Sequence, residues 1–165
     1  MTKNITQNLN INTNWIHLNN FQKNIDLSFF NHDKYKNDIK SLDKKMSDIL
    51  CDDSWMGNCA KYQLNSGGKR FRAILALLAS KIFGLSKQVS HDIAICCEFI
   101  HNASLIHDDL QDRDLLRRGL PTIWNRFGDH TAINLGDLFI SASFEIISKI
   151  KTRPDLKCLA IEELS

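Results

Sequence analysis

The chain has 165 residues, of which 43% are hydrophobic and 24% are charged, and its formal net charge is +2. This length and composition predict one soluble globular domain with a hydrophobic core of its own. A charge balance so close to neutral excludes wholesale nucleic-acid binding, which normally needs a strongly basic domain. Any basic function must therefore be local.

The five cysteines form no C-x-x-C pair and show no zinc-finger spacing with histidine, so we expect free thiols in a reducing cytoplasm. The first twenty residues contain seven asparagines and no continuous apolar stretch. They are therefore neither a secretory signal nor a membrane span, and we interpret residues 1–20 as a flexible Asn-rich lead-in. No transmembrane segment is expected elsewhere in the chain.

Apolar residues recur at three- and four-residue spacing along the rest of the sequence, and this period predicts helices. The predicted helices cover about residues 26–50, 53–64, 70–83, 90–112, 121–127, 129–151 and 154 onward. Ser90 and Asp92 are the expected start of the fourth helix. This helix is apolar around most of its circumference, which predicts a central and largely buried position. The fold class is all-α.

Three aspartates end this fourth helix, in the stretch IHDDLQD. Asp108 and Asp112 are four residues apart, so their carboxylates project from nearly the same helix face, and Asp109 lies beside them. A Mg²⁺ ion takes one or two carboxylates together with phosphate oxygens of a substrate. The spacing therefore predicts a metal site at the mouth of an apolar core, although helix surfaces also produce this pattern by chance.

Basic residues flank the aspartates in the sequence. Arg117 and Arg118 precede a glycine, and a guanidinium group binds phosphate in a two-pronged geometry. In NSGGKRFRA, Lys69 and Arg72 bracket the first turn of a helix, where an anion is favoured. His101 lies seven residues, or about two turns, before the first aspartate and so shares its face. The alternatives are an exposed turn of mixed charge, an ordinary basic helix start and a core histidine.

Taken in order, GGKRFRA, FIHNASLIHDDLQD, LLRRGLPT and NLGD resemble the trans-prenyltransferase family, the polyprenyl diphosphate synthases that include farnesyl and geranylgeranyl diphosphate synthases. The resemblance covers about residues 60 to 145. It implies the all-α isoprenoid synthase fold, whose active cavity lies inside a helical bundle, with residues 21–165 as the amino-terminal half of that domain. It also implies an enzyme that condenses isopentenyl diphosphate with an allylic diphosphate.

The resemblance implies a role for each candidate residue. Four basic residues would bind the diphosphate of isopentenyl diphosphate: Lys69, Arg72, His101 and Arg118. Three residues would form the first aspartate-rich motif, which binds Mg²⁺ bridging the allylic diphosphate: Asp108, Asp109 and Asp112. Arg117 would contact the same allylic diphosphate. Metal and arginine charge would stabilise the departing diphosphate as the allylic C–O bond breaks.

The resemblance also suggests the length of the product. In this family the side chains just before the first aspartate form the floor on which the growing tail stops. Here these positions are Ala103 and Ser104, which are both small. An open floor predicts a product longer than farnesyl.

The chain differs from the family in length, because members are roughly twice as long and carry a second aspartate-rich motif in their other half. By itself the chain is expected to bind diphosphate poorly and not to turn over. We expect it to form a homodimer or to associate with a chain that supplies the carboxy-terminal half. The predicted half-bundle would expose the apolar faces of the helices at 90–112 and 129–151.

Three other interpretations remain open at the level of sequence. The chain could be a non-catalytic subunit of a heteromeric prenyl synthase, or a decayed fragment without function. His91-Asp92 and His107-Asp108 also suggest a metal-dependent phosphohydrolase of the HD type. That interpretation gives no role to the GGKR and RRG stretches.

Overall fold

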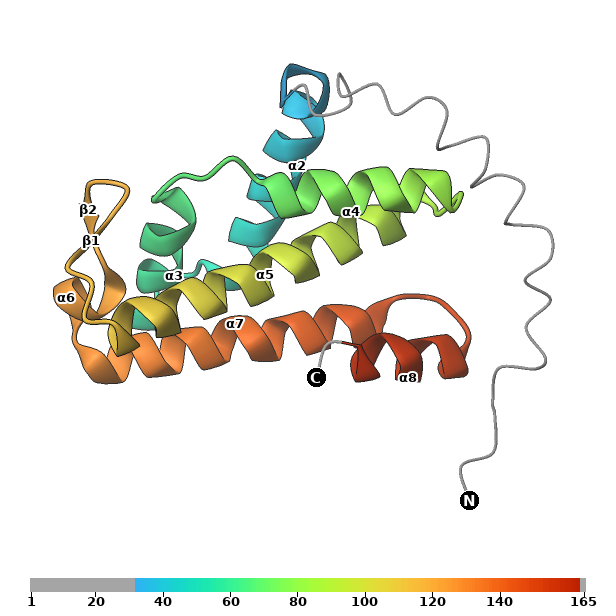
Figure 1. Cartoon of the computed structure of the whole chain (residues 1–165). Helices are drawn as coiled ribbons and strands as arrows, with labels where there is room; N and C mark the ends of the chain where they lie inside the picture. The colour runs from blue at the N-terminus through green and yellow to red at the C-terminus, as the bar shows by residue number, and fades with distance from the viewer. Residues whose placement is uncertain (1–31, 164–165) are drawn as a thin grey trace. The chain divides into compact units, whose positions relative to one another are not determined.

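The computed structural model describes residues 32–163, and the segments with helical apolar spacing form seven helices there (Figure 1). The helices are α2 (His32–Leu50), α3 (Trp55–Asn65), α4 (Phe71–Ile82), α5 (Lys87–Gln111), α6 (Ile123–Phe127), α7 (Asp129–Lys149) and α8 (Pro154–Glu162). The all-α class is confirmed. The Asn-rich lead-in of residues 1–20 lies outside the described residues.

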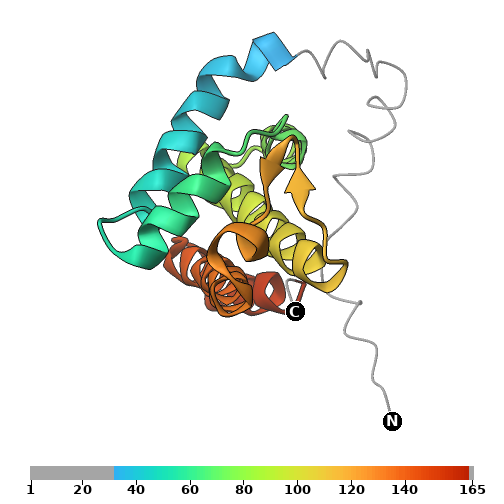
Figure 2. The same ribbon diagram turned by 90° about the vertical axis from the view of Figure 1, so that its left-hand side faces the viewer.

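Helix α5 is the centre of the unit that begins at Tyr35, and it lies between α4 and α7 (Figures 1 and 2). Phe99 of α5 and Phe139 of α7 are fully buried and meet edge to face, with ring centroids 5.3 Å apart. Met46 of α2 is also fully buried in the same core. Burial of each such side chain contributes about 1.5–3 kcal/mol, so this central stripe holds the helices together. The predicted central position of the fourth helix is therefore correct.

The start of α5 differs from the predicted one. The helix begins at Lys87, and the side chain of Ser86 accepts a hydrogen bond from the backbone N–H of Val89. Ser90 is a buried residue inside the first turns, and its hydroxyl donates to the carbonyl of Ser86 at 2.8 Å. Both serines carry a capping side chain, and the one nearer to the preceding glycine turn is the cap.

A short antiparallel hairpin follows α5, where the sequence predicted no strand. Strand β1 (Leu116–Arg117) pairs with β2 (Leu120–Pro121), and Arg117 lies opposite Leu120. The two linking residues, Arg118 and Gly119, have φ angles of 55° and 79°. Left-handed conformations at both positions are typical of two-residue hairpin turns. Strands of two residues are too short to produce an alternating pattern, so periodicity could not predict them.

The prediction that the two long helices expose their apolar faces is wrong for α5 and almost entirely wrong for α7. No large apolar side chain of α5 is among the exposed ones, and on α7 only Ile133 is, at 45%. The reason is that α4 and α7 cover α5 from two sides. Exposed apolar side chains lie instead on α4, on the hairpin and on the turn between α4 and α5, such as Leu75, Leu116 and Phe83.

Within residues 32–163, none of the helices is both long and apolar enough to span a lipid bilayer. All five cysteines of the chain are free thiols.

Candidate functional site

The loop before α4 takes its shape from a buried arginine. Arg70 has a left-handed backbone, with φ at 48°, and its side chain is 8% exposed. The guanidinium donates to Asp43 Oδ1 at 2.8 Å and to the carbonyl of Leu64 at 2.9 Å, and it lies 3.7 Å from Glu98 Oε2. These contacts stabilise a backbone conformation that is rare outside glycine. Arg70 is therefore a structural residue between the two candidate residues on either side of it.

Glu98 of α5 holds the other end of this loop. Its Oε1 accepts the backbone N–H of Ala73 at 3.0 Å, in the first turn of α4. The carboxylate is buried, and it satisfies an N–H group that a helix start leaves without an intrahelical partner. The start of α4 is thus fixed against α5, and Lys69 and Arg72 are fixed with it.

Four of the predicted phosphate-binding residues meet at one cavity of about 640 Å³. They are Lys69, Arg72, His101 and Arg118. Gly68 also lines it, and the guanidinium of Arg118 lies 3.0 Å from the position that a Cβ of Gly68 would take. Arg118 also donates to the carbonyl of Gly67. A residue with a side chain at position 68 would strain the backbone, with φ at 140°, and would require the guanidinium of Arg118 to shift.

Three further residues of the cavity wall were not predicted from the sequence. Glu98, Asn102 and Leu105 line it together with His101. Their spacing of three and four residues places them on one face of α5, so the helical period starting from His101 would have identified them. Asn102 Oδ1 accepts from Gln63 Nε2 at 3.1 Å, and Asn102 Nδ2 donates to the carbonyl of Glu98 at 2.8 Å. These bonds fix the amide side chain in the wall.

His101 is the titratable group of this cavity. Its Nε2 lies 3.2 Å from Nη1 of Arg72, and a guanidinium can only donate, so Nε2 accepts and Nδ1 carries the proton. Burial lowers the pKa of His101 below its ordinary value of 6.5, and the positive charges of Arg72, Arg118, Arg117 and Arg70 lower it further. The imidazole is therefore neutral at pH 7 until an anion enters.

The three aspartates have different environments at the end of α5. Asp109 is buried, and its carboxylate takes hydrogen bonds from Nε of Arg117 at 2.8 and 2.9 Å and an ion pair from Nη2 at 2.6 Å. This pairing raises the pKa of Arg117 above its ordinary value. Asp108 and Asp112 are exposed, and the N–H of Asp112 bonds to the carbonyl of Asp108 at 2.8 Å.

Carboxylates in the last turn of a helix are electrostatically unfavourable, because the carboxyl end of the helix dipole is itself negative. The last turn of α5 contains no basic residue, and Arg113 beyond it pairs with Asp129 at 2.9 Å. Arg117 makes its ion pair with Asp109 and acts on Asp108 only through a weaker charge interaction. The exposed pair Asp108 and Asp112 thus lies at a negative helix end and is suited to an added cation.

The fit to a metal ion is partial. Among the residues that the structure describes, no three His, Cys, Asp or Glu side chains gather into a group that could hold one. Asp109 is occupied by Arg117, which leaves Asp108 and Asp112. Two carboxylates are sufficient for Mg²⁺ when substrate phosphate oxygens and water supply the remaining ligands. Asp108 and Asp112 could therefore hold Mg²⁺ only together with such a substrate.

The two His-Asp pairs of the phosphohydrolase interpretation do not meet. His91 lies 3.5 Å from Asp38 of α2, whereas the Nε2 of His107 lies 3.3 Å from the carbonyl of Ile133 on α7. Sixteen residues of one helix separate the two histidines, or about 24 Å along its axis. This separation removes the structural basis of that interpretation.

The hairpin joins the basic cavity to the aspartates. Its consecutive residues Arg117 and Arg118 contact Asp109 and the loop before α4, respectively. The hydroxyl of Tyr62 donates to the carbonyl of Pro121 at 2.7 Å and fixes the second strand. Basic donors and exposed carboxylates therefore adjoin at one end of α5, as binding of a diphosphate with its counter-ion requires.

Comparisons with known proteins identify the family of the chain. The polyprenyl synthetase family model matches residues 53–165. Over 133 residues the chain is 34% identical to the geranylgeranyl diphosphate synthase of Methanosarcina mazei, and the match covers 78% of this chain and 41% of that protein. It is also 41% identical over 104 residues to the geranylfarnesyl diphosphate synthase of the same organism, over 63% of this chain and 35% of that one.

Solved structures show the same fold. The geranylgeranyl pyrophosphate synthetase of Geoglobus acetivorans superposes with a TM-score of 0.70 at 32% identity, over 78% of this chain and 43% of that one. An FPP/GFPP synthase of Zymomonas mobilis gives a TM-score of 0.72 at 29% identity, over 82% and 52% of the two chains. The chain thus spans about half or less of the length of the proteins it matches. By its family-model match, its relatives and its fold, the chain belongs to the polyprenyl synthetase family.

Proposed function

We propose that residues 21–165 form the amino-terminal half of a prenyl diphosphate synthase, which condenses isopentenyl diphosphate with an allylic diphosphate. In this proposal the cavity beside α4 binds the isopentenyl diphosphate. The end of α5 binds the allylic diphosphate together with Mg²⁺. Turnover requires a carboxy-terminal half, either on a longer chain or on a partner, and a homodimer is a further possible assembly.

One observation carries this proposal. Side chains from the α4 loop, from α5 and from the hairpin meet at one cavity, with Lys69, Arg72 and Arg118 supplying charged donors. Among the described residues that line the cavity, Glu98 is the only carboxylate, and it already contacts Arg70 and the N–H of Ala73. The cavity is therefore an anion site, and guanidinium donors are suited to phosphate oxygens.

The chain's own residues would act by holding charge. In the proposed reaction the allylic C–O bond breaks, and the C=C bond of the isopentenyl group attacks the resulting cation before a proton is lost. Arg117 would stabilise the negative charge that develops on the departing diphosphate, and its hydrogen bonds to Asp109 fix its orientation. Asp108 and Asp112 would hold Mg²⁺, which supplies further neutralisation of that charge when bound.

A complementation assay tests the proposal. The purified chain is mixed with the carboxy-terminal part of the geranylgeranyl diphosphate synthase of Methanosarcina mazei, Mg²⁺, labelled isopentenyl diphosphate and an allylic diphosphate. We expect prenyl diphosphate products from the mixture and none from either part alone. Asp108→Asn should abolish product, whereas Asp48→Asn, which changes an exposed aspartate on α2, should not.

Two outcomes would contradict the proposal. Product from the chain alone would show that no second half is needed. Absence of product from a mixture that assembles by size-exclusion chromatography would favour a non-catalytic subunit or a fragment without function.

A further inference from the structure

The turn that joins α4 to α5 presents apolar side chains outward. Ile82, Phe83 and Leu85 are 45%, 66% and 41% exposed. Gly84, with φ at 66°, reverses the chain between Phe83 and Leu85. In Figure 1 the turn lies at the end of the α4–α5 pair, away from the aspartates at the other end of α5. It thus belongs to neither the basic cavity nor the aspartate site.

The charge along the chain through this turn is positive, and the carboxylates of Asp92 and Glu145 lie in an adjoining cavity. Lys81 precedes the apolar residues and Lys87 follows them, and residues 80–91 contain no aspartate or glutamate. The side chain of Lys87 is 79% exposed, and its Nζ lies 3.9 Å from Oδ1 of Asp38, which makes this a long ion pair. Apolar residues between two lysines are suited to a lipid interface. The apolar groups enter below the headgroups, while the flexible lysine stems keep their ammonium groups at the phosphates.

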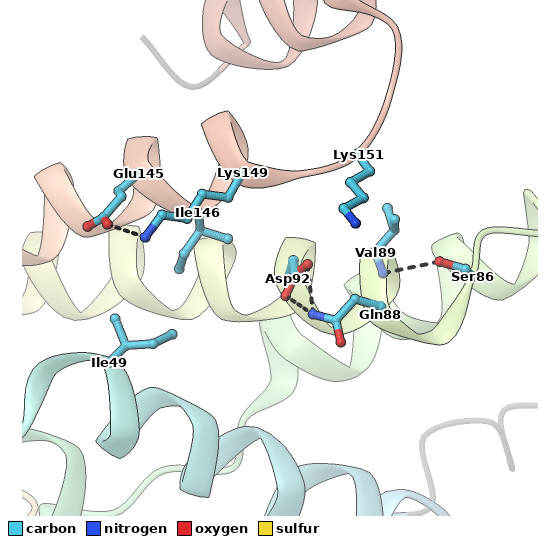
Figure 3. Close-up of a pocket in the computed structure, with 9 residues that line it drawn as sticks. All are labelled: Ile49, Ser86, Gln88, Val89, Asp92, Glu145, Ile146, Lys149 and Lys151. Atoms are coloured by element: carbon cyan, nitrogen blue, oxygen red, sulfur yellow. Dashed lines mark hydrogen bonds and ion pairs between the residues drawn. The ribbon is translucent and has the colours of Figure 1, made fainter.

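A second cavity of about 670 Å³ adjoins the turn and adds further lysines (Figure 3). Ser86 and Val89 from the start of α5 line it together with Ile146 from α7. Lys149 and Lys151 line the same cavity. Lys149 pairs with Glu145, whereas Lys151 has no ion pair within the described part of the chain. The lining also includes the carboxylates of Asp92 and Glu145, so the cavity has mixed charge, and Lys151 contributes an ammonium group beside the exposed turn.

We propose that this end of the molecule, the apolar turn at 82–85 with Lys81, Lys87 and the adjoining cavity, binds an anionic lipid surface. Three exposed apolar side chains make too small a patch for a specific protein interface. They are sufficient for interfacial insertion when lysines add attraction to anionic headgroups. The inference does not depend on the proposed function, because membrane association can be measured without diphosphate or turnover.

Vesicle flotation tests the proposal. The chain is mixed with vesicles of phosphatidylcholine alone or of phosphatidylcholine with a minority of phosphatidylglycerol. We expect binding to the anionic vesicles, weak binding to the neutral ones, and loss of binding at high salt because the attraction is screened. Lys81→Gln with Lys87→Gln should lower the partition coefficient by about twenty-five-fold, since each lysine contributes about fivefold near an anionic surface.

The apolar contribution is tested with a matched control. Phe83→Ser with Leu85→Ser should lower binding by about tenfold or more. Leu115→Ser with Leu116→Ser removes two leucines that are 58% and 60% exposed on the other side of the fold, and it should leave binding unchanged. All positions are exposed, and circular dichroism would verify that each variant folds. Equal binding to neutral vesicles, or an equal loss in the control variant, would overturn the proposal.

Discussion

At the scale of single residues, the basic cavity combines three charged donors with a histidine that is kept neutral. Arg72 and Arg118 both lower the pKa of His101, and burial lowers it more. An anion bound between these groups would counteract the positive charge of the arginines and so raise the pKa of His101. Binding of a diphosphate is therefore expected to be coupled to protonation of His101.

The pH dependence follows from this coupling. The pKa of His101 is below 6.5 in the free chain, and a bound anion raises it, so proton uptake accompanies binding between the two values. Affinity for pyrophosphate should rise as pH falls through the bound-state pKa and level off below the free-state pKa. Nuclear magnetic resonance titration of the histidine ring protons, with and without pyrophosphate, would measure both values.

His101→Gln provides the control for this measurement, because pyrophosphate itself titrates in the same region. The variant should retain only the ligand's own pH dependence. An identical pH profile in both proteins would show that His101 does not take up the proton.

Single residues also show why the site could be predicted only in part. Lys69, Arg72, His101 and Arg118 lie within recognisable local patterns, and the structure brings all four to one cavity. The roles of Arg70 and Glu98 depend on each other across α4 and α5, and on Asp43 of α2. No local spacing encodes such a contact. The separation of Asp109 from the other two aspartates likewise depends on the hairpin arginine that reaches it.

At the scale of elements, Glu98 links α5 to the beginning of α4 and to Arg70. Glu98→Ala would leave the guanidinium of Arg70 buried with one carboxylate partner fewer and Ala73 N–H without an acceptor. Removing one partner of a buried ion pair should lower the free energy of unfolding by about 3 kcal/mol. Urea denaturation followed by circular dichroism would measure it.

The matched comparison is Asp155→Ala, which breaks the exposed pair between Asp155 and Arg153. Exposed pairs contribute little, so this variant should unfold like the wild type. If both substitutions had the same small effect, Glu98 would not link the elements as described.

A second contact between elements occurs where α5 crosses α7. A Cβ at Gly136 would collide with the ring of His107, whose Nε2 lies 3.3 Å from the carbonyl of Ile133. Gly136→Ala should therefore lower the free energy of unfolding by about 1–2 kcal/mol, even though alanine is the better helix former. Thermal or urea denaturation would measure the change.

The double variant Gly136→Ala with His107→Ala distinguishes the cause. Removing the ring should restore part of the stability that the single glycine substitution loses. If the two substitutions lowered the free energy of unfolding additively, the ring of His107 would not be the obstacle.

The elements were largely predictable because helical periodicity is a local property, and α4, α7 and α8 begin within one residue of the expected positions. Helix starts were less certain where two capping side chains compete, as Ser86 and Ser90 do. The hairpin was missed because its register depends on left-handed residues at the turn rather than on alternation. Periodicity alone could not predict how much of the surface of α5 is buried, because this depends on its packing against neighbouring helices.

At the scale of the whole molecule, α5 is covered by α4 and α7, and the aspartates lie at one end of it. Ser104, four residues before Asp108, is exposed, whereas Ala103 is 2% exposed in the core. Of the two residues predicted to form the floor of the product cavity, only Ser104 is therefore accessible to a growing tail in this structure.

This difference gives a prediction for the complemented enzyme. Ser104→Phe should shorten the products, because a bulky ring would stop the tail close to the aspartates. Chromatography of the dephosphorylated products would measure their length. Ser141→Phe, at an exposed position on α7, is the control and should leave the product length unchanged. Unchanged products from Ser104→Phe would show that the floor lies elsewhere.

The most direct test of the account is a calorimetric titration of the isolated chain with inorganic pyrophosphate. We predict saturable binding at one site with an affinity of about millimolar. Arg72→Ala should weaken it about tenfold, because a charged donor is lost, and Lys61→Ala, at an exposed position on α3, should leave it unchanged. Absence of binding, or an equal effect of both substitutions, would contradict the assignment of the cavity as a diphosphate site.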